Sequence, residues 1–146
     1  MKKIFILFFF ITACGYQPLY VSNNKNLFSE INLIGEKKIA RQIVNFASLG
    51  ENSNSKNTNV ISLEISENTI ATLKDNKGKI ASYKTTITAK VLIKKNNKII
   101  SEKFFDESFS YNNLDNKYDL SSYQKDVKRN LAKKIAEDLL IYINLQ

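Results

Sequence analysis

The amino-acid sequence predicts an α+β fold in which two helices cover one face of a mixed four-stranded sheet. Four segments carry apolar residues at alternate positions, the period of a half-buried strand, and two carry them every three or four positions, the period of an amphipathic helix. The segments follow one another in the order β-α-β-β-β-α, and a crossover followed by hairpins builds a mixed sheet. A chain of 146 residues has room for one such domain.

The first 13 residues have the three parts of a secretory signal peptide. A basic MKK start precedes a short apolar run over residues 4–11 (IFILFFFI), and small Ala13 stands directly before Cys14. A membrane-spanning helix needs about 20 apolar residues, so this run is too short to be a stable anchor. We therefore expect residues 1–13 to be removed during export. The alternative is a short buried strand with an incidental cysteine.

Cys14 is the only cysteine of the chain and the predicted lipidation site. Residues 11–14 (ITAC) resemble the bacterial lipobox, in which an aliphatic residue and two small ones precede a cysteine that becomes the acylated first residue. Two or more acyl chains anchor a protein stably, because each buried methylene contributes about 0.8 kcal/mol. In bacterial lipoproteins an aspartate after the cysteine usually marks the inner membrane, so Gly15 indicates the outer membrane. We expect the protein to be lipid-anchored there on the periplasmic side.

Residues 14–25 hold the single proline and a polar SNNKN stretch, which predict a lipidated tether ahead of one domain over residues 26–146. Alternating apolar residues from Leu27 predict the first strand. A helix is predicted between Gly35 and Gly50, with Gly50 ending it. Its apolar face would consist of Ile39, Ala40, Ile43, Phe46 and Ala47.

Three strands are predicted next, after an exposed connection over residues 51–59. The first contains Ile61, Leu63 and Ile65 and continues to Leu73 with a bulge near Ile70. In the second, the predicted inner face is Ala81, Tyr83, Ile87, Ala89, Val91 and Ile93, and the outer face is Ser82, Lys84, Thr86, Thr88 and Lys90. Turn-forming residues 75–79 and 95–98 have the length of hairpin joints, so an antiparallel meander is expected.

The third of these strands, Ile99 to Tyr111, has apolar residues on both faces, with Phe104 beside Phe105, so the sequence leaves its buried face open and allows a partner contact. The last element is a long amphipathic helix that is predicted to begin near Ser121, which forms a capping box with Gln124. Its apolar residues repeat every four positions: Val127, Leu131, Ile135, Leu139 and Ile143. Its opposite, basic side contains Lys125, Lys128, Arg129, Lys133 and Lys134.

The residue types of the chain predict that it is not an enzyme. There is no histidine, and an acylated Cys14 offers no thiolate, which excludes Ser-His and Cys-His nucleophiles and histidine metal ligands. The acidic pairs Asp106-Glu107 and Glu137-Asp138 are sequence neighbours, so their carboxylates should diverge. We expect no catalytic residue, no metal and no cofactor.

Lysines are the informative polar set in a chain of net charge +8. Lys74, Lys77 and Lys79 cluster at one predicted hairpin tip, and Lys84 and Lys90 project from the polar side of the next strand. Another group, Lys94, Lys95 and Lys98, surrounds the second turn. Ammonium groups on an exposed sheet can bind phosphates of an anionic glycolipid. The alternative is ordinary solubilising lysine. The chain has no nucleic-acid-binding motif, so no nucleic-acid partner is expected.

Several parts of the sequence resemble those of one protein family. Residues 14–20 (CGYQPLY), the hairpin GKIASYKTTITAKVLI followed by FFDESFSYN, and the order of elements are similar to the lipopolysaccharide-assembly lipoprotein family, the E component of the Lpt translocon, in the form that begins CG[FY]xPLY. The resemblance covers nearly the whole chain, and its sharpest parts are residues 14–20 and the G-x-x-x-x-Y of residues 78–83.

The resemblance implies a lipoprotein that plugs the large outer-membrane β-barrel of the translocon, helps assemble it, and binds lipopolysaccharide during delivery to the cell surface. Basic residues near the hairpin tip would contact the lipopolysaccharide. Asn76 stands at the expected tip position, and residues 119–122 at a second one, so the candidates carried over are the neighbouring Lys77 and Lys79, with Lys84 beside them.

Two other functions fit the same anchor and charge. A stand-alone lipoprotein that binds a lipid or small ligand would have a cavity between sheet and helices, whereas a plug would have a filled core and a functional exterior. A pilotin-like chaperone of another outer-membrane complex would differ from the plug only in its partner.

Overall fold

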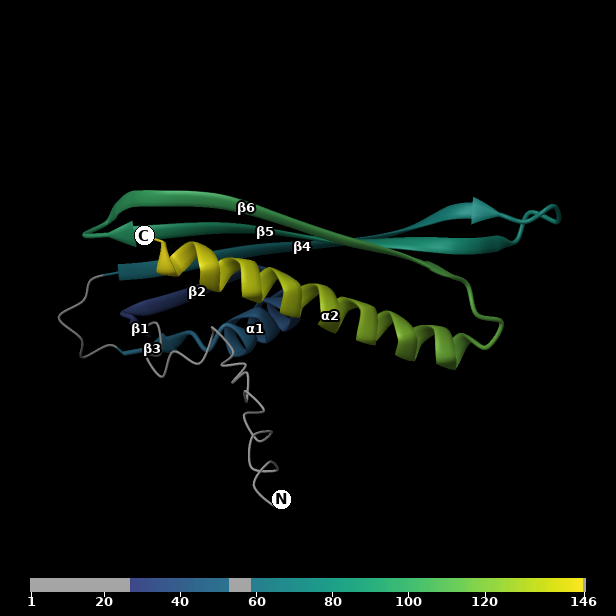
Figure 1. Cartoon of the computed structure of the whole chain (residues 1–146), viewed down its shortest axis with the longest axis horizontal. Coiled ribbons are helices and arrows are strands. Elements are labelled where there is room, and N and C mark those ends of the chain that lie inside the picture. Colours follow the sequence, from purple (N-terminus) through teal and green to yellow (C-terminus); the bar gives the residue numbers. More distant parts are fainter. Residues whose placement is uncertain (1–26, 53–58, 146) are drawn as a thin grey trace, which may run out of the picture.

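The computed structural model describes residues 27–52 and 59–145 and has the predicted architecture (Figure 1). The predicted signal peptide, the tether and Cys14 lie outside the described residues. The elements are β1 (Leu27–Phe28), β2 (Glu30–Gly35), α1 (Lys37–Phe46), β3 (Gly50–Glu51), β4 (Asn59–Lys74), β5 (Ile80–Lys95), β6 (Lys98–Asn112) and α2 (Lys117–Asn144). A four-stranded sheet has the order β2-β4-β5-β6, and β1 and β3 form a separate two-residue parallel ladder.

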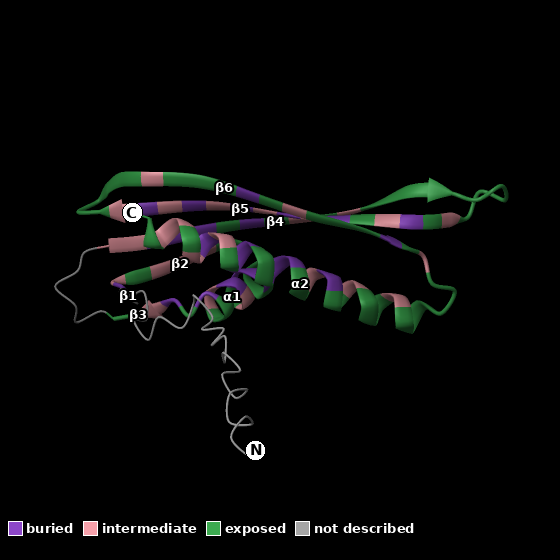
Figure 2. Ribbon diagram, viewed as in Figure 1, coloured by how far each residue is buried: buried purple, intermediate pink, exposed green. Residues whose placement is uncertain are grey.

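Both helices pack on one face of the four-stranded sheet, as predicted, and leave the other face open (Figures 1 and 2). The strand β2 is parallel to β4, and the other two pairs are antiparallel. The helix α1 packs on β2 and β4, α2 packs on β5 and β6, and the two helices contact each other. The predicted inner residues Ile61, Leu63 and Ile87 of the sheet are fully buried beneath them.

The chain can leave the sheet after β2 because residue 35 is glycine. Gly35 has φ +77° and lies so close to β4 that a Cβ built there would be 2.1 Å from the carbonyl oxygen of Ile65. The N–H of the next residue, Glu36, donates to that same carbonyl at 3.0 Å. This contact joins the end of β2 to β4 and directs the chain into α1.

The helix α1 ends differently from the prediction. The N–H groups of Ser48 and Leu49 donate to the carbonyls of Asn45 and Val44, and Ser48 takes φ +49°, so a Schellman-type cap ends the helix before Gly50, which lies in β3 instead. Ile39, Ala40, Ile43 and Ala47 are buried as predicted. Phe46 is 40% exposed, because it lies at the edge of this stripe in the last turn.

The β4–β5 hairpin forms as predicted, and its bulge lies at Thr72, two residues beyond Ile70. The Thr72 hydroxyl is 2.7 Å from that of Ser82, which explains why Ser82 is buried on the open face. Beyond this row the hairpin extends past the helices (Figure 1). Ala81, predicted to face inward, is therefore exposed.

The strand β6 buries one of its two neighbouring phenylalanines. Phe105 lies in the core with its ring edge-to-face against Tyr142 of α2, at 5.9 Å between centroids. Phe104 points to the open face and is 54% exposed. Tyr111 is buried, whereas Phe109, on the same face, is half-exposed near the end of the sheet.

The helix α2 begins four residues earlier than predicted. Asn116 is the N-cap residue and accepts a hydrogen bond from the Tyr118 N–H at 2.9 Å, so the helix starts at Lys117 rather than near Ser121. The predicted four-residue repeat of apolar side chains is confirmed, with Val127, Leu131, Ile135 and Leu139 buried and Ile143 packed against the edge of the core.

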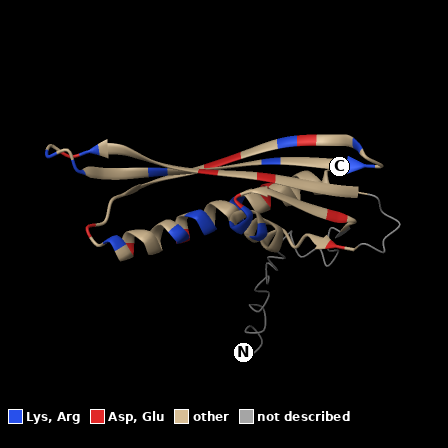
Figure 3. Ribbon diagram, turned by 180° about the vertical axis from the view of Figure 1, so that it is seen from behind, with Lys and Arg blue, Asp and Glu red and all other residues tan. Residues whose placement is uncertain are grey.

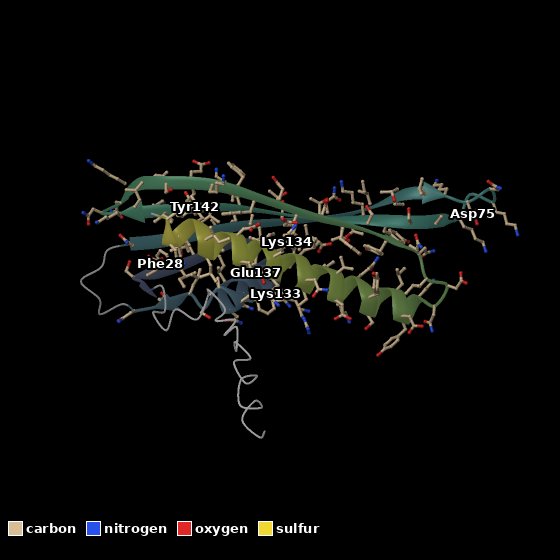
Figure 4. All side chains as sticks on the ribbon, viewed as in Figure 1. Phe28, Asp75, Lys133, Lys134, Glu137 and Tyr142 are labelled. Carbon is tan, nitrogen blue, oxygen red and sulfur yellow. The ribbon has the colours of Figure 1, made fainter. Side chains whose placement is uncertain are left out.

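Two ion pairs connect α2 to the sheet, and both use lysines of its predicted basic side. Lys128 contacts Glu67 of β4 at 2.8 Å, and Lys134 contacts Glu107 of β6 at 2.6 Å. The register places both glutamates in one row on either side of Ile87. Since these lysines lie three residues before and after Leu131, they flank the buried stripe of the helix. Figure 4 shows Lys134 nearer the sheet than Lys133.

The first prediction compares two glycines with positive φ. Gly35→Ala should lower the free energy of unfolding by about 3 kcal/mol or more, because the new methyl group meets the β4 backbone as well as an unfavourable φ. Gly78→Ala, at φ +79° with no atom within 4 Å, should lower it by about 1–2 kcal/mol. Urea denaturation followed by circular dichroism measures both, and equal losses would contradict the close approach of β2 to β4.

The second prediction concerns alkaline pH. The hydrogen bond to Glu107 raises the pKa of the Lys134 ammonium above 10.5. Its contribution to stability is therefore fully present below pH 10.5 and is lost as the pH rises through the raised pKa. The difference in unfolding free energy between wild type and Lys134→Gln should be constant at neutral pH and shrink above pH 10.5.

Lys133→Gln is the matched control, because the Lys133 ammonium lies 4.0 Å from Glu137 and both side chains are exposed. It should change stability little at any pH. A pH-independent difference between wild type and Lys134→Gln in urea titrations would show that the contact with Glu107 does not form.

Candidate functional site

The tip of the β4–β5 hairpin presents two of the predicted ligand-binding lysines. The Asp75 carboxylate accepts hydrogen bonds from the backbone N–H groups of Lys77 and Lys79, both at 2.8 Å, and Gly78 N–H donates to the Asp75 carbonyl. Asp75 therefore stabilises the turn, and Lys77 and Lys79 form no ion pair within the described part of the chain. Figure 4 shows this tip at the far end of the sheet.

Lys84 does not join the tip lysines. It lies on the open face, in register with Ile70 of β4 and Ser110 of β6. Five residues of extended chain separate it from Lys79, roughly 17 Å. The structure therefore brings Lys77 and Lys79 together with Lys74, and it places Lys84 apart from them.

The other predicted basic residues are partly engaged. Lys90 makes an ion pair with Glu102 at 3.2 Å and lies over the Phe104 ring, 5.5 Å from its centroid. The lysines of the β5–β6 turn lie at the opposite end of the sheet from the hairpin tip, where Asn96 and Asn97 both take positive φ. Positive charge is thus distributed over both ends of the sheet and along α2 (Figure 3).

The open face of the sheet carries short polar side chains between Lys84 and Lys90. Two rows across β4, β5 and β6 consist of Ser66, Thr88 and Asp106 and of Asn68, Thr86 and Ser108. Within the first row the Thr88 hydroxyl donates to Asp106 at 2.5 Å. The strict alternation of β5 predicted this polar face, but no single residue type marked it as a functional surface.

A chain of hydroxyl groups lies on the helix-covered side of the same region. Thr85 is fully buried, and its hydroxyl is 2.8 Å from that of Thr69 and 3.0 Å from that of Tyr111. The Tyr111 ring also packs against Tyr83 and Tyr123, with centroids 5.9 and 5.5 Å away. Sequence analysis missed this cluster, because a tyrosine and two threonines spread over three strands leave no local pattern.

A hollow of about 360 Å³ adjoins this cluster at the molecular surface. It is lined by Phe109, Ser110, Tyr111 and Asn112 of β6, by Leu114, and by Tyr123 of α2. It therefore lies beside the outer edge of β6, whereas the apolar side chains between sheet and helices, such as Ile43, Leu63 and Ile135, are fully buried and packed together.

The acidic pair Asp106-Glu107 diverges, as predicted. Asp106 contacts Thr88 on the open face, while Glu107 contacts Lys134 on the helix face. Within residues 27–52 and 59–145, no three acidic or cysteine side chains gather in a way that could hold a metal ion. None of the helices that the structure describes has the length and apolar character needed to cross a membrane.

Comparison with known proteins gives matches in structure only. No protein-family model matches the chain, and a search of curated proteins finds no relative. Among solved structures, the rare lipoprotein B from Shewanella oneidensis superposes with a TM-score of 0.61 at 10% identity, over 79% of this chain and 93% of that one.

Two further lipoproteins share the fold. A minor lipoprotein from Acinetobacter baumannii has a TM-score of 0.60 at 12% identity, over 80% of this chain and 89% of that one. A lipoprotein from Caulobacter crescentus has a TM-score of 0.58 at 13% identity, over 78% and 85%. The chain therefore has a fold that is found in bacterial lipoproteins.

Proposed function

We propose that this protein is an outer-membrane lipoprotein that plugs and helps assemble the β-barrel of the lipopolysaccharide translocon, and that it binds lipopolysaccharide during delivery to the cell surface. Support comes from the lipobox-like residues 11–14, from the resemblance of residues 14–20 and 78–93 to the translocon's lipoprotein, and from a fold shared with bacterial lipoproteins. The protein performs no catalysis in this role and needs no cofactor.

The filled core is the observation that carries the proposal. Ile43, Leu63 and Ile135 are fully buried between sheet and helices, while the open face carries two rows of short polar side chains together with the exposed Ile70 and Phe104. A carrier that holds its ligand between sheet and helices would need a cavity there, whereas a plug acts through its exterior. The interior wall of a large outer-membrane barrel is polar, so Ser66, Thr86 and Ser108 suit contact with it.

The hairpin tip supports the proposed contact with lipopolysaccharide. The Asp75 carboxylate accepts hydrogen bonds from the turn backbone, so the Lys77 and Lys79 side chains extend from a hydrogen-bonded turn, and their ammonium groups can bind phosphate. The stand-alone lipid-binding lipoprotein is the second candidate, and the aromatic-lined hollow beside β6 is the observation that favours it.

The third prediction tests the barrel contact. Affinity purification of the acylated protein from gently solubilised membranes should recover a large β-barrel in roughly equal amount. Phe104→Ser should lower this recovery by roughly tenfold without unfolding the protein, because the ring is exposed on the open face.

Phe105→Ser does not serve as an equivalent variant, since its ring packs against Tyr142 and its loss should destabilise the fold by about 3–5 kcal/mol. The appropriate control is Phe46→Ser, an exposed phenylalanine on α1. Recovery of the wild-type protein without a barrel would refute the plug function and favour the carrier.

The fourth prediction tests the hairpin tip. Replacing Lys77 and Lys79 together by alanine should weaken binding of purified lipopolysaccharide by roughly tenfold, and the loss should diminish at high salt. The control replaces Lys95 and Lys98, at the opposite end of the sheet, which should change affinity less than twofold. Surface plasmon resonance measures both, and equal effects of the two pairs would exclude a site at the tip.

A further inference from the structure

We propose that the barrel partner adds an extended segment to the free edge of β6 at residues 108–112, with one apolar side chain of that segment seated in the aromatic-lined hollow. This inference rests on the proposed function and names how the partner is held. It follows from the direction of the β6 peptide groups, from the distribution of charge along the edge, and from the position of the hollow.

The strand β6 is the last strand of the sheet, and its outer edge pairs with no other strand in residues 27–52 and 59–145. Its register with β5 pairs Asn112 with Ser82, and the next N–H, of Asn113, donates to the Ala81 carbonyl at 2.8 Å. Hydrogen-bonded pairs alternate in an antiparallel ladder, so the odd-numbered residues of this part of β6 bond to β5. The N–H and C=O groups of Ser108, Ser110 and Asn112 therefore point outward.

Charged side chains protect the outer edge of β6 against pairing with another strand over only part of its length. Glu102, Lys103, Asp106 and Glu107 supply charges to the first half, which also contains the irregularity opposite Lys94, and these are the features that prevent strands from pairing edge to edge. Residues 108–114 (SFSYNNL) contain no charged side chain. Ser108, Ser110 and Asn112 are exposed, so this half of the edge is accessible and unprotected.

The hollow lies directly beside this unprotected half. Ser110 and Asn112, whose peptide groups point outward, line it together with Phe109, Tyr111 and, from α2, Tyr123. In strand addition, main-chain hydrogen bonds supply affinity and pockets for alternate side chains supply specificity. Outward peptide groups spaced by two residues match another extended peptide, whereas a lipid or sugar has no donors and acceptors at that repeat.

Two proline variants test the edge. In Ser110→Pro the outward N–H is lost while the hydrogen bonds to β5 stay intact, since proline is tolerated where its nitrogen faces away from the ladder. Glu102→Pro makes the same change at an outward position in the charged half. We expect the first variant to reduce barrel recovery at least about tenfold and the second to stay within about twofold of wild type. Circular dichroism checks that both variants fold.

Amide exchange gives a second, residue-level measurement on the purified complex. In the free protein the amides of Ser108, Ser110 and Asn112 should exchange fast, while those of Phe109 and Tyr111 are already bonded to β5. Binding of a strand should slow the three even-numbered amides at least about tenfold and leave the odd-numbered ones unchanged.

Each outcome of these experiments either supports or overturns the addition of a strand to β6. Alternate-residue protection together with loss of the barrel in Ser110→Pro supports strand addition. A barrel retained equally by Ser110→Pro, or even-numbered amides that exchange as in the free protein, overturns it and leaves the proposed function standing. Protection that rises with concentration in the isolated protein overturns it in favour of a second copy of this chain. Absence of the barrel from the wild-type preparation overturns the proposed function and this inference with it.

Discussion

The packing of α2 across the sheet is the interaction on which the rest of the structure depends. Leu131 is buried, and the lysines three residues before and after it form ion pairs with Glu67 of β4 and Glu107 of β6, which lie in one row with Ile87. Burial supplies most of the stability, because partly exposed ion pairs contribute little. The ion pairs contribute to the alignment of the helix, because its orientation brings Lys128 to Glu67 and Lys134 to Glu107. Since α1 packs on the same side, the opposite face of the sheet remains open.

That asymmetry determines where function can lie. The side chains between sheet and helices are buried, and the surfaces considered for binding are the open face, the hairpin tip beyond the helices and the edge of β6 (Figure 2). These surfaces have different chemistry: short hydroxyls and an exposed Phe104 on the face, unpaired ammonium groups at the tip, and outward peptide groups beside an aromatic hollow at the edge. A single compact domain can thus contact a polar barrel wall, phosphate and an extended peptide without competition between them.

The fold could be predicted because its signals are local. The alternation of apolar and polar residues predicted the inner face of β5 around Ile87, and the four-residue repeat of apolar side chains predicted the buried stripe of α2. Errors occurred where tertiary contacts decide. The sequence predicted that Gly50 ends α1, whereas Ser48 takes the positive φ at the end of this helix. The sequence also predicted that α2 begins near Ser121, whereas Asn116 caps it, because the chain leaves β6 there. At the site, the lysine cluster at the tip was predicted, whereas the hydroxyl chain from Thr85 and the ion pairs of two α2 lysines depend on contacts between distant segments.

In the proposed function, the open face of the sheet meets a β-barrel. A direct measurement places a photo-cross-linking residue at Asn68, in one of the two polar rows of that face, in living cells. If the open face lies against the barrel, the cross-linked product contains a large outer-membrane β-barrel. Cross-links to lipid alone, or no product from Asn68 while the exposed Asn45 on α1 gives one, would contradict it.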